Sequence, residues 1–432
     1  MFKSFLYYWV RITLSVVNRI FYRNIHMVGE ENLPANKPVI IASTHTNSFL
    51  DGVMIMSLME RISYSLARGD AFLNPKFNRI LRSMNLLPIF RATDADPRES
   101  VRRNNEMFDE TYELLLKNRA IIIFSEAISV PGKKVRTVRK GTARMAADMM
   151  KRSNMELDLH VIPLGMNYGH FRGPRKSLTL KFGKAIKLSE YVEEIKNTEA
   201  KFVNHLTRTL QSEFEEQMVI APDGQEDTFD ELLQVAAGEH PVDPLMQFDR
   251  SEREFRFEKE IGETVIQEGN IALERTSSYV AKRNAVDLSE YKRYSSGQKW
   301  LRAIHFILTI LPSLLTMILH GWIMPTAKKM TPKKIKTPVF FDSVYMGIIL
   351  LGMYAAGLVF FPISFFIYGW GGVLIYWVLR WSLPAYFQNV EFLSNWTQKR
   401  KWKKLERNNP ALFQDLDQMR KEILEASIPA KD

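Results

Sequence analysis

The sequence predicts an α/β domain with a mostly parallel central sheet flanked by helices, followed by helices that enter a membrane. Short continuous apolar runs predict the strands, because strands buried on both faces are apolar at every position. Helical periodicity between these runs predicts a parallel sheet, whose strands are joined through helices. Apolar residues also concentrate between about 304 and 383, which predicts the membrane part.

Residues 1–26 predict an amphipathic helix that lies in a membrane interface. Their apolar residues recur at helical spacing, with cations and several aromatic residues among them. Arg11 interrupts the apolar stretch and no small-residue cleavage site follows, so the pattern of a signal peptide is not matched. The alternative is a helix that packs on the protein's own domain.

Residues 27–220 predict the α/β domain. The predicted strands are 38–42, 86–90, 120–124, 160–164 and 178–182, and helical periodicity covers 99–118 and 140–153. Residues 221–300 are polar and charged with a scattered helical pattern, so we expect a helical linker or accessory region there.

Residues 301–386 predict membrane-embedded helices. The run 304–325 is nearly uncharged and just long enough to cross a bilayer. The run 343–386 is about twice that length, with glycines near residue 370 for a turn, and is typical of two spans. A soluble core accounts for one such run but hardly for two in succession.

Residues 387–432 form a basic, charged tail for which we expect helical structure. Lysines and arginines cluster between the two apolar runs and again after the second. The positive-inside rule places both clusters in the cytoplasm, whereas three full spans place both across the membrane from the α/β domain. A re-entrant or surface-lying first segment removes this conflict, and the basic clusters then lie against anionic lipid.

The net charge of +11 is typical of proteins that bind nucleic acid, an anionic membrane surface or phosphorylated substrates. No zinc-finger pattern, aromatic RNP-like strand or basic region joined to heptads is present, so we expect membrane lipids and no nucleic acid as partners. The absence of cysteine excludes disulfides, thiolate metal sites and a cysteine nucleophile.

His45 and Asp51 are the candidate catalytic residues. His45 follows the predicted strand 38–42, and open α/β sheets place their active sites beyond the carboxyl ends of strands. A carboxylate at Asp51 can accept a hydrogen bond from one imidazole nitrogen and leave the other as a base for a hydroxyl. The alternative is an ordinary surface-loop histidine.

Three further predicted strands carry candidate residues, two of them at the strand end. Arg91 ends the strand Leu-Pro-Ile-Phe-Arg and offers a planar fork for phosphate. Glu126 follows the strand 120–124 and is expected to bind an acceptor hydroxyl or to hold Arg91; the alternative is a helix N-terminal acid. Pro163, within the strand 160–164, suits a strand edge or a tunnel wall.

The order of these motifs, THTNSFLDG, LPIFR, FSEAIS and VIPLGMN, resembles the glycerolipid acyltransferase superfamily, the lysophosphatidate acyltransferase-like enzymes. The likeness extends from about Gly29 to Lys184. It implies that His45 is the general base and Asp51 its orienting carboxylate. It also implies that Arg91 and Glu126 line the acceptor site and that Pro163 flanks the acyl-donor channel.

The resemblance further implies acyl-CoA or acyl-acyl-carrier protein as co-substrate, with no cofactor and no metal. Two departures from the family pattern stand out. Five residues separate His45 from Asp51 where the common spacing is four, as in some glycerol-3-phosphate acyltransferases, notably fungal ones; a bulge or turn can absorb the extra residue. Ala127 replaces the usual glycine of the third motif, and the arginine that often follows is missing.

The phosphate charge is then expected to be met by basic residues further along, with Lys140 as the leading candidate because a helix begins beside it. The four candidates are Lys133, Lys134, Arg136 and Lys140. The alternative is a solvated basic face that touches lipid head groups.

The sequence lacks the Gly-x-Ser-x-Gly elbow of serine hydrolases and both common nucleotide-binding glycine motifs. The resemblance, together with the apolar segments, implies a membrane-bound acyltransferase of phospholipid biosynthesis, integral to or tightly associated with the membrane, with its active site facing the cytoplasm. The acceptor stays open between glycerol-3-phosphate, a 1-acyl-glycerol-3-phosphate and another lysolipid. The alternative function is a catalytically silent lipid-binding or scaffold protein of the same fold, although such a protein has no chemical need for all four motif residues.

Overall fold

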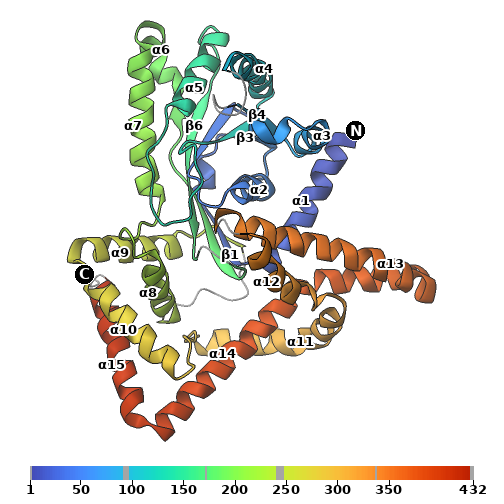
Figure 1. Ribbon diagram of the computed structural model, residues 1–432, viewed down its shortest axis with the longest axis vertical. Helices are drawn as coiled ribbons and strands as arrows, with labels where there is room; N and C mark the ends of the chain where they lie inside the picture. Colours follow the sequence, from blue (N-terminus) through green and yellow to red (C-terminus); the bar gives the residue numbers. More distant parts are fainter. Residues whose placement is uncertain (1, 91–96, 171–172, 240–247, 336–337, 429–432) are drawn as a thin grey trace.

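The computed structural model describes residues 2–90, 97–170, 173–239, 248–335 and 338–428, and is built around one sheet (Figure 1). The strand order is β4-β3-β5-β2-β6-β7-β1-β9, with β8 paired to β6. All pairs are parallel except those that β6 makes with β7 and β8. The strands are β1 Tyr22–Val28, β2 Val39–Ser43, β3 Ser63–Arg68, β4 Leu86–Ile89, β5 Ala120–Phe124, β6 His160–Tyr168, β7 Lys176–Phe182, β8 Ile186–Lys187 and β9 Phe248–Asp249. The predicted fold class is confirmed.

Helices cover both faces of the sheet and explain why the strands are apolar at every position. On β2, Val39 and Ile41 face a cluster shared with α1, α2 and α13, whereas Ile40 and Ala42 face a cluster shared with α4, α5, α6 and α7. The flanking helices of the domain are α1 Phe2–Phe21, α2 Phe49–Leu58, α3 Pro75–Ser83, α4 Pro97–Leu116, α5 Gly141–Arg152, α6 Val192–Asn197 and α7 Glu199–Gln217. All five predicted strands are present, and α4 and α5 cover the two stretches with predicted helical periodicity.

The N-terminal helix is shorter than expected, because it ends at Phe21 and residues 22–28 form β1 instead. Its second half packs on the protein's own domain, with Val16 and Ile20 buried in the core. Tyr8 and Trp9, in the first half, are exposed. Only the first half therefore presents the aromatic surface that we expect of an interfacial helix.

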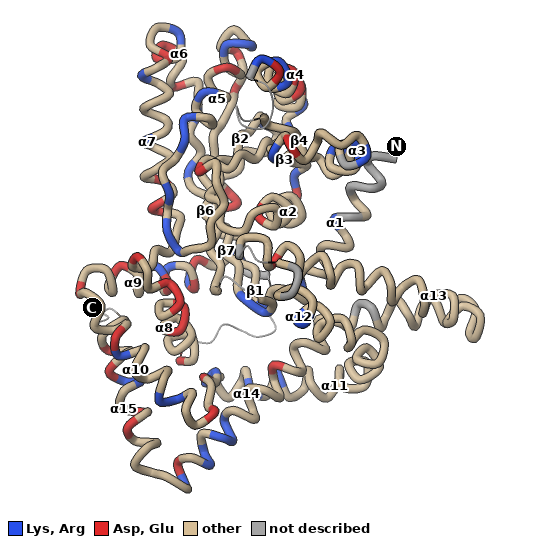
Figure 2. The backbone as a smooth tube through the Cα atoms, in the orientation of Figure 1, with Lys and Arg blue, Asp and Glu red and all other residues tan. Residues whose placement is uncertain are grey.

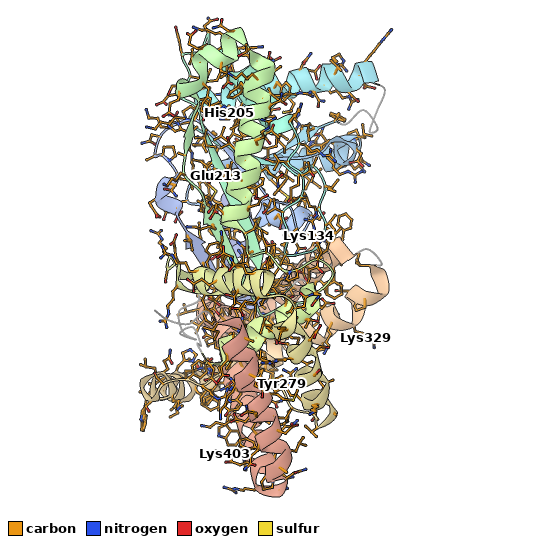
Figure 3. All side chains as sticks on the ribbon, turned by 90° about the vertical axis from the view of Figure 1, so that its left-hand side faces the viewer. Lys134, His205, Glu213, Tyr279, Lys329 and Lys403 are labelled. Carbon is orange, nitrogen blue, oxygen red and sulfur yellow. The ribbon has the colours of Figure 1, made fainter. Side chains whose placement is uncertain are left out.

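A separate helical subdomain follows the α/β domain. It consists of α8 Glu226–Glu239, α9 Arg253–Glu268, α10 Ile271–Ala285 and the last helix α15 Pro410–Ser427. These helices share their own apolar core, to which α14 contributes Trp402. Figure 3 shows Tyr279 and Lys403 of this lower part of the molecule below His205 and Glu213 of α7. The polar region 221–300 and the C-terminal tail therefore build one unit together.

Two helices of the C-terminal region are long and apolar enough to cross a membrane, Ser296–His320 and Phe341–Leu379. The first is α11 (Ser296–His320), and the second belongs to α13 (Phe341–Trp381), which bends at Gly369 with φ 58°. Only 17% and 22% of the residues in their most apolar stretches are buried, unlike a core helix of a soluble protein. Figures 1 and 2 show both helices extending from one side of the molecule, with α13 almost free of charged residues.

Two further helices return the chain to the folded domains. Helix α12 (Ile323–Lys334) follows α11 and buries Ile323 and Ala327 in the core cluster of the α/β domain. Helix α14 (Leu383–Asn408) follows α13 and leads to the helical subdomain. The lysines Lys328 and Lys329, between the two apolar runs, therefore lie on a helix that packs against the domain.

Candidate active site

The first motif folds as a loop between β2 and α2, and it brings His45 and Asp51 together. The Nδ1 atom of His45 lies 2.9 Å from Oδ2 of Asp51. His45 follows the carboxyl end of β2, and Asp51 lies in the first turn of α2. The His45 side chain is 17% exposed while that of Asp51 is fully buried. The carboxylate is thus held inside the domain, and the imidazole reaches the surface.

Asp51 is fixed by more than the histidine. Its Oδ2 also accepts the backbone N–H groups of Thr46 at 2.9 Å and Asn47 at 2.8 Å. Its Oδ1 accepts the hydroxyl of Tyr168, at the end of β6, at 2.6 Å. Burial raises the pKa of Tyr168 well above its ordinary value, and the negative charge of Asp51 adds to this rise, so the phenol stays protonated and donates.

Ser48, which lies between His45 and Asp51 in the first motif, has an unusual backbone conformation. It occupies the N-cap position of α2 with φ 45° and ψ −134°, a backbone conformation that residues other than glycine rarely adopt. The backbone N–H of Ser48 donates to Oγ of Ser129 at 2.6 Å, which ties the loop to the third motif. That a turn here absorbs the longer His–Asp spacing stays a prediction.

His45 is also oriented by its neighbours. Its ring stacks on Phe124 at the end of β5, with 4.0 Å between centroids and an angle of 17°. With Nδ1 directed at a carboxylate, the neutral ring carries its proton on Nδ1 and leaves Nε2 as the basic nitrogen. Within the described part of the chain, Nε2 has no hydrogen-bond partner. The arrangement is that of a general base whose basic atom is open to a substrate.

Glu126 holds the loop that carries His45. Its Oε2 accepts the backbone N–H of His45 at 2.9 Å, and its Oε1 accepts that of Arg136 at 2.8 Å. The side chain is buried, and Nη1 of Arg136 lies 3.6 Å from Oε2. Burial raises the pKa of Glu126, whereas the two N–H groups and the charge of Arg136 oppose the rise. Both oxygens are engaged by backbone amides, and a contact of Glu126 with the acceptor or with Arg91 stays a prediction.

Residues 24–167 match the protein family described as Acyltransferase, and they include His45, Asp51, Arg91, Glu126, Lys140 and Pro163. The matched segment is the part of the chain that carries all four motifs. The family is the one that the four motifs resemble, so that prediction is confirmed.

Among solved structures, the chain is similar to the crystal structure of the 1-acyl-sn-glycerophosphate (LPA) acyltransferase PlsC from Thermotoga maritima, with 20% identity and a TM-score of 0.28. This similarity covers 42% of this chain and 72% of that chain, and it is too low to transfer the substrate of that enzyme. A search of curated proteins gave no match.

The strand ends of the acyltransferase domain meet at one edge of the sheet. Strands β4, β3, β5, β2 and β6 are parallel neighbours, so the third motif and the end of β6 lie beside the first motif. Arg91 lies outside the described residues. The residue before it is fixed, because the side chain of Asn104 bonds both the N–H and the carbonyl of Phe90, at 2.9 Å and 2.8 Å.

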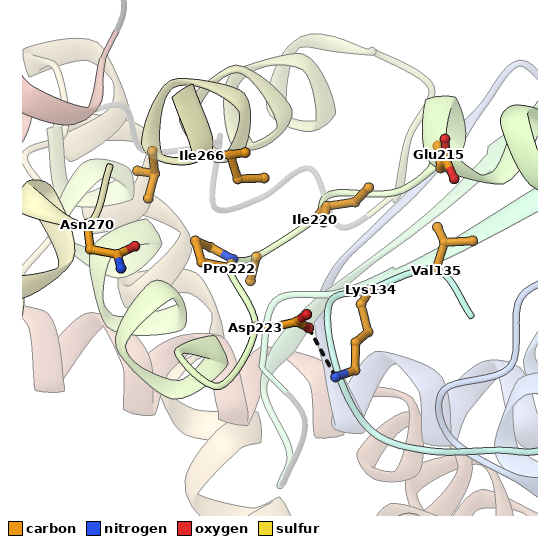
Figure 4. A pocket seen from close by; sticks show the side chains of 10 residues that line it. Lys134, Val135, Glu215, Ile220, Pro222, Asp223, Ile266 and Asn270 are labelled. Atoms are coloured by element: carbon orange, nitrogen blue, oxygen red, sulfur yellow. Dashed lines mark hydrogen bonds and ion pairs between the residues drawn. The ribbon is translucent and has the colours of Figure 1, made fainter. Parts of the chain in front are cut away.

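The basic residues after the third motif have separate environments. Lys133 is buried, bonds the carbonyl of Tyr168 and lies 3.2 Å from Asp230, so it is a structural cation. Lys134 lies 3.3 Å from Asp223 in a pocket of about 570 Å³ that none of the four motifs lines (Figure 4). Lys140 is exposed and immediately precedes α5, as expected. Arg136 approaches Glu126, whose carboxylate binds the backbone N–H of His45.

Pro163 lies within the sheet. It is buried on β6 opposite Ala42 of β2, at the point where the antiparallel partner of β6 changes from β8 to β7. A residue without an N–H is tolerated at such a break in pairing. Pro163 thus lies on an interior strand and not at the edge of the sheet that we expected. Its place in a donor channel stays a prediction.

We expect Glu126→Gln to lower the free energy of unfolding by about 1–3 kcal/mol, because an amide NH₂ replaces one acceptor of two buried backbone N–H groups. The acyltransferase kcat is expected to fall less than in a His45 variant, since the His45–Asp51 contact persists. Thermal unfolding and steady-state kinetics measure both effects. Glu110→Gln, which removes an exposed partner of Arg82, is the control and leaves Tm nearly unchanged.

The two roles of Glu126 predict different results. A positioning role predicts a lower Tm and a lower kcat with little change in the KM for the acceptor. An unchanged Tm together with a strongly raised KM for the acceptor would instead assign Glu126 to acceptor binding.

Proposed function

We propose that this protein is a membrane-bound O-acyltransferase that transfers a fatty acyl group from acyl-CoA or acyl-acyl-carrier protein to a glycerol-phosphate-type acceptor. The acceptor is glycerol-3-phosphate or a lysophospholipid. The observation that carries the proposal is the contact of 2.9 Å between Nδ1 of His45 and the buried Asp51, with Nε2 open at the surface.

The reaction follows from this pair. Nε2 of His45 takes the proton of the acceptor hydroxyl while its oxygen attacks the thioester carbonyl carbon. The carbon–sulfur bond breaks, an ester forms, and the leaving thiolate takes the proton from the imidazolium. Asp51 stabilises the imidazolium through Nδ1. No protein nucleophile is required, in accord with the absence of cysteine.

The acceptor phosphate requires cations at the same sheet edge. We assign this role to Arg91, which comes two residues after β4 ends at Ile89, with Lys140 and the N-terminus of α5 as a second contact. Two hydrogen bonds to Ser125 support the assignment of Lys140 and the N-terminus of α5. The backbone N–H of Arg139 donates to the carbonyl of Ser125 at 2.8 Å, and the side-chain hydroxyls of Thr142 and Ser125 lie 2.8 Å apart. The loop before α5 is thereby tied to the third motif.

Membrane association is supported by the exposed apolar surface of α11 and α13. Leu308 and Ile318 on α11 and Leu358 and Phe366 on α13 are each more than 70% exposed. Exposed apolar area of this extent is typical of a membrane or protein contact. Because α12 packs on the α/β domain after α11, we propose that α11 is re-entrant or lies along the membrane surface. The active site and the lysines of α12 then share the cytoplasmic side.

An acceptor panel tests the function. Purified full-length protein in lipid vesicles is given labelled acyl-CoA with glycerol-3-phosphate, 1-acyl-glycerol-3-phosphate, other lysophospholipids, or no acceptor. We expect labelled ester with at least one phosphorylated acceptor. No ester with any acceptor and any thioester donor would favour a lipid-binding or scaffold protein of the same fold.

Replacing Arg91 by alanine is expected to raise the KM for a phosphorylated acceptor about tenfold or more, because a charge-assisted hydrogen bond to phosphate is lost. Lys140→Ala is expected to have a smaller effect, since Lys140 is exposed. Lys134→Ala is the control, because Lys134 pairs with Asp223 in a separate pocket. Equal KM values in Arg91→Ala and the wild type would move the phosphate site elsewhere.

A further inference from the structure

The first turn of α13 reaches the loop that carries the catalytic pair. Asp342, the second residue of α13, is 1% exposed. Its Oδ2 accepts the side-chain amide of Asn47 at 2.8 Å, and its Oδ1 accepts the N–H of Gly173 at 2.8 Å. Asn47 lies between His45 and Asp51, so the apolar helix and the catalytic loop are directly bonded.

The catalytic loop needs such external contacts. Ser48 has a positive φ of 45°, and an unfavourable backbone conformation persists only where the surroundings hold it in place. Side chains from outside the loop hold the two residues at the strained point. Ser129 binds the N–H of Ser48, and Asp342 binds the side chain of Asn47. Without the second contact, the loop is free to relax toward a less strained conformation.

Lys176 connects Asp342 to the other side of the catalytic carboxylate. Its ammonium group, buried on β7, forms an ion pair with Asp342 and lies 4.9 Å from the ring centroid of Tyr168. The hydroxyl of Tyr168 donates to Oδ1 of Asp51. Asp342 is therefore linked to Asp51 by two routes, through Asn47 on the Oδ2 side and through Lys176 and Tyr168 on the Oδ1 side.

We propose that Asp342 is a positioning residue for catalysis, and that His45 and Asp51 are aligned only while the first turn of α13 is seated against the α/β domain. The proposal rests on the proposed acyltransferase function. A charge at the start of a membrane-spanning helix is costly unless it is paired, and here the paired charge holds the catalytic loop. The membrane segment thereby completes the active site.

Another carboxylate offers a matched control. Glu391 on α14 also ties the C-terminal helices to the α/β domain, through Arg175 at 2.6 Å and Arg23 at 3.3 Å. Neither arginine contacts the His45 loop among the described interactions. A variant at Glu391 removes an interdomain ion pair without removing a contact to the catalytic loop.

The kinetic test compares Asp342→Asn, Asn47→Ala, their combination and Glu391→Gln in full-length protein in lipid vesicles. We expect each of the first two to lower kcat about tenfold to hundredfold with small changes in KM, because misalignment of a catalytic group slows the chemical step. The combined variant is expected to be no slower than the slower single variant, since both substitutions act on the same Asn47–Asp342 hydrogen bond. Glu391→Gln is expected to stay within about twofold of the wild type. Asn47→Ala preserves the Lys176–Asp342 pair and provides the test if Asp342→Asn does not fold.

A second readout does not depend on activity. Nitrogen NMR of ¹⁵N-histidine-labelled protein in vesicles, with His45→Gln for assignment, reports which ring nitrogen carries the proton. We expect the Nδ1–H form in the wild type and in Glu391→Gln, and a mixture of both forms in Asp342→Asn and Asn47→Ala. This result supports the positioning role even if the wild type transfers no acyl group to any acceptor. Wild-type kcat and an unchanged tautomer in Asn47→Ala would overturn the proposal, as would equal losses of kcat in Asp342→Asn and Glu391→Gln.

Discussion

Replacing His45 by alanine is expected to lower kcat by about 10²–10⁴-fold, the range usual for loss of a general base. The imidazole contributes the only basic atom of the pair that is open to a substrate, because Asp51 is fully buried. The fold is expected to persist, since the backbone N–H of residue 45, which Glu126 binds, is retained. Steady-state rates of labelled ester formation, together with Tm, measure both effects.

A second histidine provides the control for this variant. His205 lies on α7, is 51% exposed and contacts Glu194 (Figure 3). His205→Ala is expected to keep the wild-type kcat, and His45→Ala to keep the wild-type Tm within a few degrees. If His45→Ala were folded and retained more than about a tenth of the wild-type kcat, His45 would not be the general base.

Replacing Asp51 by asparagine is expected to lower kcat by a similar factor, about 10²–10⁴-fold, and also to destabilise the protein. The neutral amide no longer stabilises the imidazolium, and its NH₂ group cannot accept the bonds that one carboxylate oxygen accepts. Oδ2 receives three donors and Oδ1 receives one, so we expect a loss of about 1–3 kcal/mol in the free energy of unfolding.

Tyr168→Phe separates these two effects of Asp51. It removes only the hydroxyl that donates to Oδ1 and leaves the charge and the Oδ2 bonds in place. We expect a loss of about 1 kcal/mol in stability and a much smaller fall in kcat than in Asp51→Asn. Equal kcat values in Asp51→Asn and the wild type would show that Asp51 does not orient the base, whatever the stability.

The sequence predicted those parts of the fold that depend on local burial. Strands β2 and β5 lie at the centre of the sheet with both faces covered, so all their positions are apolar or small. Strand β1 was not predicted, because it carries Asn24 and His26 in its interior. Nε2 of His26 lies 2.5 Å from Glu254 on α9, more than two hundred residues away, and no local pattern reveals that partner.

In the candidate site too, contacts between residues close in sequence could be predicted, whereas contacts between distant residues could not. The approach of His45 to Asp51 follows from a strand end and the next helical turn, which are adjacent in sequence. Tyr168 directly follows the motif VIPLGMN and has no sequence signal of its own, because its role depends on the parallel pairing of β6 beside β2. The contact of Asn47 with Asp342 joins residues 295 positions apart, and only the packed structure shows it. Glu126 was predicted from its position, whereas its bonding depends on the conformation of two loops.

The most direct test of the account follows the thioester itself. Purified protein is mixed with acyl-CoA carrying a labelled acyl group, and free thiol, labelled ester and labelled protein are measured over the first turnover with and without acceptor. The account predicts thiol release and ester formation only with acceptor, in equal amounts, and no acyl label on the chain. A burst of thiol without acceptor, together with label bound to the protein, would contradict direct attack by a hydroxyl that His45 deprotonates.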